Sequence, residues 1–294
     1  MSGAHTPAER NTEENDMQAQ DPAAWFGGTP RVMFVHAHPD DETITTGGTL
    51  AGLAAAGQEP LLVTLTRGER GEVVPGPFAQ LQGTDGLAPH RQAELAAALF
   101  MLGVERHAFL GVEPARAADL TPVIYEDSGM AWGPDGRAVA APDANRDALT
   151  RAPAVEALND LLAAAHDAGA RAIVSYDDGG GYGHPDHVFA HRLARAVAHA
   201  LGLPFWEIVA DPESVGAGSD DAAAEAAEAA VAEYEVHDVT PWLDRKVAAL
   251  RSHATQLTVD GDEIVHVGGQ RQPVGEREAF RLRAAAVGGS ARSE

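Results

Sequence analysis

Cysteine is absent from this chain of 294 residues. That absence excludes a disulfide framework, a cysteine nucleophile and a thiolate metal site, so metal ligands must be imidazole and carboxylate groups. Positive charge is scarce as well, because 21 Lys and Arg face 44 Asp and Glu and leave a formal charge of −23. Such an acidic chain is not expected to bind nucleic acid or an anionic membrane by charge alone. A small neutral or cationic substrate suits it better.

Long apolar runs are also missing, since none approaches the roughly 20 residues of a membrane span. The first 30 residues are acidic and have no apolar centre, so they match neither a secretory signal nor a transit peptide. We therefore expect a soluble, cytoplasmic protein. With 45% hydrophobic residues the chain can bury a substantial core. The sequence leaves the oligomeric state open.

Strand and helix patterns alternate through most of the chain. Strands are expected at 31–37, 60–66, 107–111, 171–176 and 205–210, and helices at 45–56, 90–102, 153–166 and 187–201. This alternation predicts βαβ units and a mostly parallel sheet. The expected fold is therefore α/β and Rossmann-like, with helices on both faces of the sheet and a smaller C-terminal portion.

Three segments flank or interrupt this alternation. Residues 1–29 are polar and acidic and are interpreted as a disordered leader, and 285–294 as a tail. The segment 112–151 has little periodicity, and a loop of that length is usually functional. We expect 30–210 to be the metal-binding catalytic domain and 211–284 to complete the fold and the pocket.

Within the C-terminal portion three patterns stand out. The segment 219–233 is almost all Ala, Glu and Asp and is either a solvated helix or a disordered insert. An amphipathic helix is expected at 241–257, followed by a hairpin at 257–267 that turns at Asp260-Gly261.

Two histidine and carboxylate clusters close strand-like segments: His36-Ala37-His38-Pro39-Asp40-Asp41-Glu42 and Gly183-His184-Pro185-Asp186-His187. In α/β sheets, ligands bind outside the carboxyl ends of the strands. His38 and Asp41 are three residues apart on a turn and could share one ion, and His187 would complete a set of two histidines and one carboxylate. His36 lies within the strand and is interpreted as structural.

Asp40, His184 and Asp186 remain without a metal role in this set. Hydrolysis uses such groups, because a carboxylate can take a proton from water and a donor can stabilise the oxygen that becomes negative. Asp186 is two residues from His184 and is expected to fix its tautomer or raise its pKa. The two clusters therefore predict a divided metal site for hydrolysis.

These motifs resemble those of a known family. The first cluster, followed by Gly47-Gly48-Thr49-Leu50-Ala51, and the second cluster are similar to the two signatures of the zinc-dependent LmbE/PIG-L N-deacetylases. The resemblance runs from about residue 31 to 257. Its mycothiol branch is indicated by Glu69-Arg70-Gly71-Glu72, Asp127-Ser128-Gly129-Met130, Gly181-Tyr182-Gly183, Asp244-Arg245-Lys246 and His253-Ala254-Thr255-Gln256.

The resemblance implies a set of site roles. It implies Zn²⁺ on His38, Asp41 and His187, with Asp40 as general base and His184 as oxyanion stabiliser or acid. Fe²⁺ is the alternative ion in vivo, because affinity order alone does not select the metal that a cell supplies. Which of Asp40 and His184 protonates the leaving amine stays open.

The resemblance also implies the substrate, an N-acetylated glucosaminyl-inositol that would yield acetate and the free amine. Arg91 and Asp127 would contact sugar and inositol hydroxyls, and Tyr182 would lean over the reacting centre. The sister activity, a mycothiol S-conjugate amidase, is the alternative. It carries a lysine shortly after the first motif, and the absence of lysine from Thr43-Ile44-Thr45-Thr46 favours the deacetylase.

The non-enzymatic alternative is a metal-dependent sugar-binding module. A carboxylate that lies beside the ion without binding it argues against this alternative, because a binding module has no use for it. Two further patterns are weaker. The charged residues Arg67, Glu69, Arg70 and Glu72 either line the pocket or, as we favour, form a solvated face. His253 and Gln256 share one face of an expected helix, where packing and a pocket role are equally open.

Overall fold

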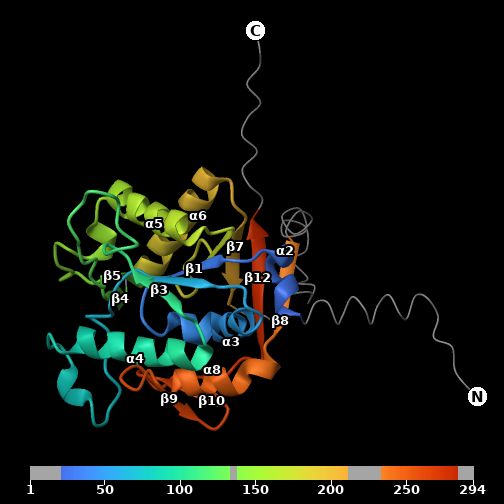
Figure 1. Ribbon diagram of the computed structural model, residues 1–294. Helices are drawn as coiled ribbons and strands as arrows, with labels where there is room; N and C mark the ends of the chain where they lie inside the picture. The colour runs from blue at the N-terminus through green and yellow to red at the C-terminus, as the bar shows by residue number, and fades with distance from the viewer. Residues whose placement is uncertain (1–20, 133–137, 211–232, 284–294) are drawn as a thin grey trace, which may run out of the picture.

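The computed structural model describes residues 21–132, 138–210 and 233–283. Its main sheet has the strand order β3-β2-β1-β6-β7-β12-β8 (Figure 1). The parallel strands are β1 (Val32–His36), β2 (Leu61–Thr64), β3 (Arg106–Phe109), β6 (Ala172–Ser175) and β7 (Phe205–Val209). The strand β12 (Arg277–Arg283) is antiparallel to both of its neighbours, β7 and β8 (Glu233–Asp238).

Helices cover both faces of this sheet, as Figure 1 shows. One face carries α5 (Ala154–Ala168) and α6 (Pro185–Leu201), and the other carries α3 (Asp41–Ala55), α4 (Leu87–Leu102) and α8 (Leu243–Leu250). The predicted Rossmann-like α/β fold is therefore confirmed. Within the described ranges, no helix is both long enough and apolar enough to cross a membrane.

The smaller elements lie around this framework. The strands β9 (Leu257–Asp260), β10 (Glu263–His266) and β11 (Arg271–Pro273) form a second sheet, and β4 (Met130–Trp132) pairs with β5 (Ala138–Ala140). Short helical turns are η1 (Pro22–Ala24), α2 (Trp25–Gly28), η2 (Ala79–Leu81), η3 (Leu149–Arg151) and η5 (Thr240–Trp242).

The strand β1 shows why the sheet separates two hydrophobic layers. Met33 and Val35 pack in the layer beneath α5 and α6, whereas Val32 and Phe34 pack with α3 and α4. Successive side chains of a strand point to opposite faces, so a run of apolar residues fills both layers. The buried strand thus fixes where its carboxyl end, and the first motif, must lie.

β1 and β6 are adjacent, but their connections run in opposite directions. β1 continues through α3 to β2 on one side, and β6 continues through α6 to β7 on the other. The carboxyl ends of β1 and β6 therefore form a topological switch point, the place where ligands bind in open α/β sheets. Both sequence motifs begin at this point.

The predicted leader is wrong for residues 21–29. They form η1 and α2, and both Trp25 and Phe26 are buried. The ring of Trp25 stacks on His237 with centroids 4.1 Å apart. Two aromatic side chains bury enough apolar surface to anchor a short segment whose other residues are polar. Residues 1–20 of the leader and the predicted tail at 285–294 lie outside the described residues.

The C-terminal portion also differs from its prediction. The helix expected at 241–257 is shorter than predicted and ends at Leu250 as α8, and beyond it Thr255 donates its N–H and hydroxyl to Glu94 at 2.8 and 2.7 Å. The hairpin expected at 257–267 is confirmed by β9 and β10. Most of the segment 219–233 lies outside the described residues, and only Glu233 is seen, as the start of β8.

The long segment 112–151 is more ordered than a simple loop. It contains β4, β5 and η3, and its first part is tied to α5 by the buried Asp160. The Asp160 carboxylate accepts hydrogen bonds from Arg116 at 2.8 Å and from the Tyr125 hydroxyl at 2.7 Å.

Candidate functional site

The first motif leaves β1 and turns sharply into α3. Asp40 stands at this turn with φ 121° and ψ −34°, a conformation that favours glycine. Another residue in such backbone costs about 1–3 kcal/mol, and the strain persists only where the surroundings enforce it. The turn makes Asp41 the first residue of α3 and brings its carboxylate beside His38.

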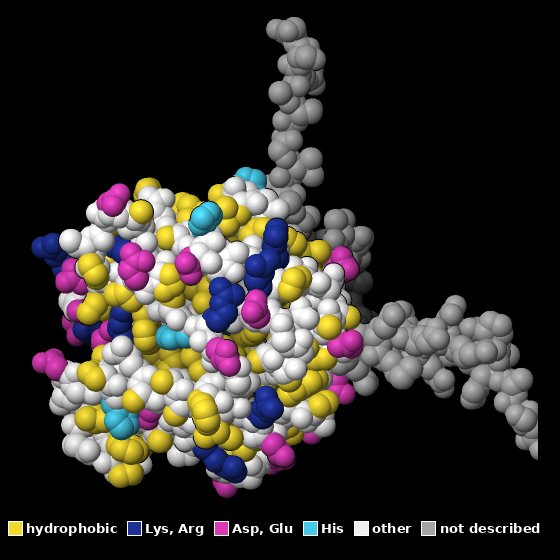
Figure 2. Space-filling model, in the orientation of Figure 1, with side chains coloured by type: hydrophobic (Ala, Val, Ile, Leu, Met, Phe, Trp, Pro, Cys, Tyr) yellow, Lys and Arg dark blue, Asp and Glu magenta, His cyan; other side chains and the backbone are white. Residues whose placement is uncertain are grey.

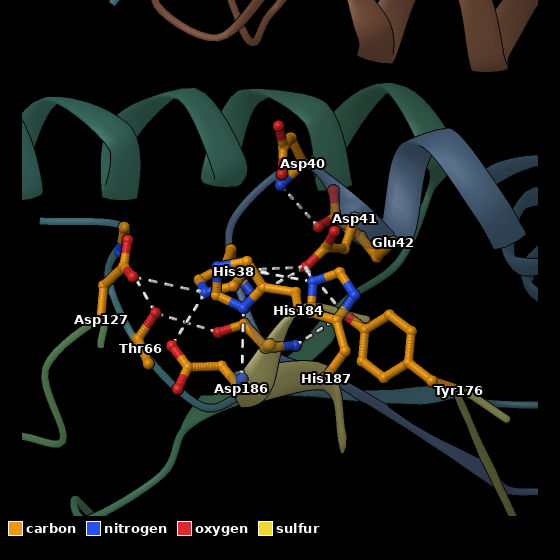
Figure 3. Close-up of polar contacts among 12 residues, drawn as sticks. His38, Asp40, Asp41, Glu42, Thr66, Asp127, Tyr176, His184, Asp186 and His187 are labelled. Atoms are coloured by element: carbon orange, nitrogen blue, oxygen red, sulfur yellow. Dashed lines mark hydrogen bonds and ion pairs between the residues drawn. The ribbon is translucent and has the colours of Figure 1, made fainter. Parts of the chain in front are cut away.

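The second motif leaves β6 and begins α6. Pro185 is the first residue of α6, where its missing N–H removes no helical hydrogen bond. His184 precedes it as the helix cap, and its Nδ1 accepts the backbone N–H of Asp186 at 3.2 Å. Because β1 and β6 are neighbours, His187 on α6 faces the first motif (Figure 3).

Three donor atoms from the two motifs meet in one small space. The Nδ1 atom of His38 is 3.2 Å from Asp41 Oδ2 and 3.3 Å from His187 Nε2, and these two partner atoms are 3.3 Å apart. An ion that holds its ligands at about 2.0–2.1 Å in tetrahedral geometry requires separations of about 3.3 Å between them. The set predicted from spacing therefore fits a small divalent cation.

His184 adds a wider alternative around the same point. One ring nitrogen of His184 lies within 4.8 Å of ligand atoms of His38 and His187, and a second grouping joins His38 and His184 to Asp127 and Asp186. Both groupings share His38, so they mark the same place in the fold. The compact set that includes Asp41 matches the tetrahedral separations, whereas His184 Nδ1 is already engaged with backbone.

Neighbouring groups hold these ligands in the form that a metal needs. His187 Nδ1 lies 3.2 Å from the carbonyl oxygen of Gly180, so this nitrogen carries the proton and Nε2 keeps its lone pair. Tyr176 donates its hydroxyl to Asp41 Oδ2 at 2.7 Å, and its ring stacks on His187 with centroids 4.1 Å apart. No sequence pattern singles out Tyr176, which is a tyrosine directly after an apolar strand.

The carboxylate of Asp186 contacts His38 and not His184. Its Oδ2 lies 3.1 Å from His38 Nε2 and accepts the Ser128 N–H at 2.9 Å. A carboxylate on the far nitrogen of a ligating imidazole orients the ring and increases its basicity. The Asp186 carboxylate therefore lies away from His184, and the predicted role of Asp186 in fixing the tautomer of that ring falls to its backbone N–H, which the helix cap presents to His184 Nδ1.

His184 is a neutral hydrogen-bond donor in this arrangement. Burial, followed by the nearby His38 and His187, lowers its pKa to about 3. Since Nδ1 accepts a backbone N–H, the remaining hydrogen must sit on Nε2. The ring centroid lies 5.0 Å from that of His187. His184 thus offers an N–H beside the proposed metal ligands.

Asp40 has the properties of a base. Burial, followed by the charge of Asp41, raises its pKa to about 7. In the part of the chain that the structure describes, no hydrogen bond or ion pair engages the Asp40 carboxylate, while its backbone N–H donates to Glu42 Oε2 at 3.0 Å. A free carboxylate whose pKa lies near neutral pH is suited to remove a proton from a reacting group.

The two motifs can be compared with known proteins. Residues 33–198, which hold both motifs and more than half of the chain, match the family described as PIG-L, GlcNAc-PI de-N-acetylase. The chain belongs to the PIG-L family.

Curated proteins include relatives of this PIG-L chain that share a name. A protein of Kineococcus radiotolerans is 38% identical, with 88% of this chain and 79% of that protein covered. A protein of Streptomyces avermitilis is 36% identical, with 86% and 91% covered. Both are named 1D-myo-inositol 2-acetamido-2-deoxy-alpha-D-glucopyranoside deacetylase.

Solved structures share the PIG-L fold at lower identity. The deacetylase of the antimicrobial A40926 pseudoaglycone has a TM-score of 0.56 at 18% identity, with 88% of this chain and 99% of that chain covered. The N,N'-diacetylchitobiose deacetylase from Pyrococcus horikoshii has a TM-score of 0.51 at 19% identity, with 86% and 80% covered. These two likenesses concern the fold alone.

The residues expected to touch substrate in this PIG-L chain differ in exposure. Tyr182 is 62% exposed, and its ring centroid lies 5.2 Å from that of His187. Asp127 is buried, with Oδ1 3.6 Å from His38 Nε2 and 2.8 Å from the Gly129 N–H that it accepts. Asp127 therefore lies beside His38, and Tyr182 beside His187.

Arg91 lies deeper than a surface contact residue. Its Nη1 and Nη2 donate to the carbonyl oxygens of Gly68 and Glu72 at 2.7 and 2.9 Å, and its buried Nε has no hydrogen-bond partner among the described residues. The guanidinium therefore holds the loop after β2 and keeps one donor uncommitted.

The favoured interpretation of the charged stretch as a solvated face is wrong for Arg67. This residue is 5% exposed, and its guanidinium carbon lies 4.8 Å from the centroid of the Phe109 ring. Glu69 accepts the Asp127 N–H at 3.0 Å, so the stretch folds towards the site. The Phe109 ring thus faces the Arg67 cation, and the Asp127 N–H supplies a donor to the Glu69 carboxylate.

His36 lies inside the sheet, in keeping with a structural role. It is fully buried, its Nε2 lies 3.1 Å from Thr46 Oγ1, and burial lowers its pKa to about 4. His36 is therefore neutral near pH 7, and its contact on α3 lies one turn beyond the first motif.

Proposed function

We propose that this PIG-L protein is a zinc-dependent hydrolase that removes the acetyl group of an N-acetyl-glucosaminyl-inositol in mycothiol biosynthesis. Its products are acetate and the free aminosugar-inositol. The shared name of the Kineococcus and Streptomyces relatives supports this substrate. The observation that carries the chemistry is the meeting of the His38, Asp41 and His187 donor atoms at 3.2–3.3 Å beside the unengaged carboxylate of Asp40.

The metal ligands are His38 Nδ1, Asp41 Oδ2 and His187 Nε2. Nitrogen and oxygen donors in this number leave a position open, as in catalytic zinc sites, and Fe²⁺ is the alternative ion for the same donors. When bound, the cation would polarise the acetamido carbonyl and make a neighbouring water more acidic.

Asp40 takes a proton from water while the water oxygen attacks the acetamido carbon. His184 donates its Nε2–H to the carbonyl oxygen as that oxygen becomes negative, a contribution of about 3 kcal/mol for a well-placed donor. The carbon–nitrogen bond then breaks, and Asp40 returns its proton to the departing nitrogen. We assign this last transfer to Asp40 because a His184 pKa of about 3 leaves no imidazolium to serve as the acid.

We assign the substrate contacts to the residues that the family resemblance implies. Tyr182 is assigned to the reacting centre, which its position against His187 supports. Asp127 and Arg91 are assigned to sugar and inositol hydroxyls, and the closeness of Asp127 to His38 supports the first of these assignments.

Acetate release from the N-acetylated glucosaminyl-inositol tests this proposal. The purified full chain is assayed as isolated, after chelation and after addition of Zn²⁺ or Fe²⁺ to the chelated protein. We expect release that stops on chelation and returns with metal. Full activity after exhaustive metal removal would contradict the metal-dependent chemistry, and binding of the sugar without acetate release would favour a binding module.

The amidase alternative is tested with the same preparation. Rates on the N-acetylated glucosaminyl-inositol and on a mycothiol S-conjugate are measured side by side at matched concentrations. We expect a higher kcat/KM for the acetylated substrate, since the first motif lacks the lysine of the amidase. A higher value for the conjugate would reverse the assignment.

A further inference from the structure

A buried polar group lies directly behind the first motif and has no role in the steps above. Glu42, Thr43 and His253 are fully buried. Glu42 Oε1 lies 3.2 Å from His253 Nε2 and accepts the Thr43 hydroxyl at 2.5 Å. Glu42 and Thr43 belong to the first turn of α3, whereas His253 follows α8 from the C-terminal portion of the chain.

The other oxygen of Glu42 reaches the strained turn. Glu42 Oε2 accepts the backbone N–H of Asp40 at 3.0 Å, and Asp40 is the residue with φ 121°. Backbone in this region needs surrounding contacts to hold it. Glu42 supplies such a contact at the peptide that sets the direction of the Asp40 side chain.

His253 in turn holds Glu42. A buried carboxylate requires hydrogen-bond partners, and removing one partner of such a pair is costly. The His253 ring is itself fixed, because its Nδ1 lies 3.1 Å from the side-chain amide nitrogen of Gln256. The hydrogen bonds thus run without a break from the segment after α8 to the backbone of Asp40.

We propose that Glu42 and His253 form a positioning pair that holds the Asp40 carboxylate in its reactive orientation. This inference rests on the proposed function of Asp40 as the base. Neither member of the pair touches the reacting atoms, so both act through Asp40. From the sequence, packing and a pocket role were equally open for His253. The structure instead assigns it a role in positioning Asp40.

A second buried group, on β8, contacts the same helix and provides a matched control. His237 Nε2 lies 3.1 Å from Glu235 Oε2, and its Nδ1 lies 3.1 Å from Thr49 Oγ1 on α3. His237 is also buried, but these two contacts of its ring do not reach the first motif. Its loss should weaken the fold without moving Asp40.

The test compares kcat, KM, metal content and Tm of single variants. We expect Glu42→Leu to lower kcat about 10- to 100-fold, as loss of supporting hydrogen bonds around metal sites does, with KM and metal content near those of the unaltered chain. Glu42→Gln restores one carbonyl acceptor and should recover most of kcat. The control His237→Leu should lower Tm and leave kcat unchanged.

A double-mutant cycle separates positioning from general destabilisation. In an Asp40→Asn background, Glu42→Leu should change the residual kcat by less than about two-fold, because contacting residues that act through one group are not additive. If Glu42→Leu does not fold, His253→Phe supplies the same comparison from the other member of the pair.

Two results would overturn the positioning pair. One is an unchanged kcat in the folded Glu42→Leu and His253→Phe variants, and the other is a full additional loss in the Asp40→Asn background. An unaltered chain that releases no acetate would instead overturn the proposed function, before any variant is measured.

Discussion

The two ring nitrogens of His38 contact different groups. Nδ1 faces Asp41 and His187, and Nε2 faces Asp186. Burial alone would lower the pKa of His38, but Asp127, Asp186 and Asp41 outweigh it and raise the pKa well above the usual value. A proton therefore competes with a cation for this imidazole, so metal affinity must fall as the pH falls.

Two substitutions separate the base from the ligands. Asp40→Ala should retain the metal and lower kcat about 10²- to 10⁴-fold, the usual contribution of a general base. His187→Ala should lose the metal, because it removes one of the three donor atoms. Metal content per chain and acetate release, measured on the same samples, check both outcomes. Near-normal turnover of Asp40→Ala would show that the base is another group.

The pH dependence follows from Asp40. Burial raises its pKa to about 7, and the carboxylate is the active form. Activity should therefore rise with pH through the pKa of Asp40 and be lost below it. A bound cation nearby favours the carboxylate, so the acid limb of kcat/KM is expected at or below about pH 7. Asp40→Asn should lack this limb, and a limb that persists in that variant would assign it elsewhere.

At the scale of elements, α3 joins the first motif to the C-terminal strands. Its residues Gly48 and Thr49 donate backbone N–H groups to Glu278 on β12 at 2.9 and 2.8 Å. Glu278 also pairs with the buried Lys246 of α8 at 2.8 Å. The helix that begins at Asp41 is thus fixed at its middle by two later elements.

The close approach at Gly48 can be tested directly. A Cβ on Gly48 would lie 2.4 Å from the Cβ of Val239, whereas one on Gly47 would lie 3.4 Å from Lys246 Cγ. We expect Gly48→Ala to destabilise the protein by about 1–3 kcal/mol through overpacking. Gly47→Ala should be neutral or stabilising by up to about 1 kcal/mol, since alanine favours helix. Thermal or urea unfolding checks the difference in sign.

The parallel strands and their helices could be predicted from the sequence because each has its own local signal. The apolar run of β1 and the Gly103 that ends α4 are examples. β8 and β12 could not, since Glu233–Asp238 and Arg277–Arg283 are rich in charged residues that alternate weakly. Their pairing with each other and with β7 supplies the stability that their composition does not indicate.

The meeting of the His38, Asp41 and His187 donor atoms could be predicted for a similar reason. His38 and Asp41 lie within one turn, and His187 is marked by a second motif of the same kind. Tyr176 and the pairing of Asp186 with His38 depend on how two strand ends face each other, which spacing along the chain does not specify. The leader was misjudged at Trp25 and Phe26 because their partners, His237 and Phe280, come more than 200 residues later.

At the scale of the whole molecule, the proposed metal set ties two parts of the chain together. His38 ends the β1 segment and His187 lies on α6, and both reach one point. Ligand binding to the folded state alone stabilises it by about 2.7 kcal/mol at a concentration 100 times Kd. We expect chelation to lower Tm and added Zn²⁺ to restore it. The Tm of His187→Ala should not respond to either, and an equal response would place the stabilising ion elsewhere.

The position of β12 has a consequence for synthesis of the protein. This strand, built from residues 277–283, fills the gap between β7 and β8, both of which precede it in the chain. While a ribosome makes the protein, the edge of β7 therefore stays exposed until residues 277–283 have emerged. Glu278 on this strand accepts the N–H groups in the middle of α3, and it is synthesised after every residue of that helix. A nascent chain that already carries both histidine motifs thus still lacks the hydrogen bonds from Glu278 that fix α3, the helix that begins in the first motif.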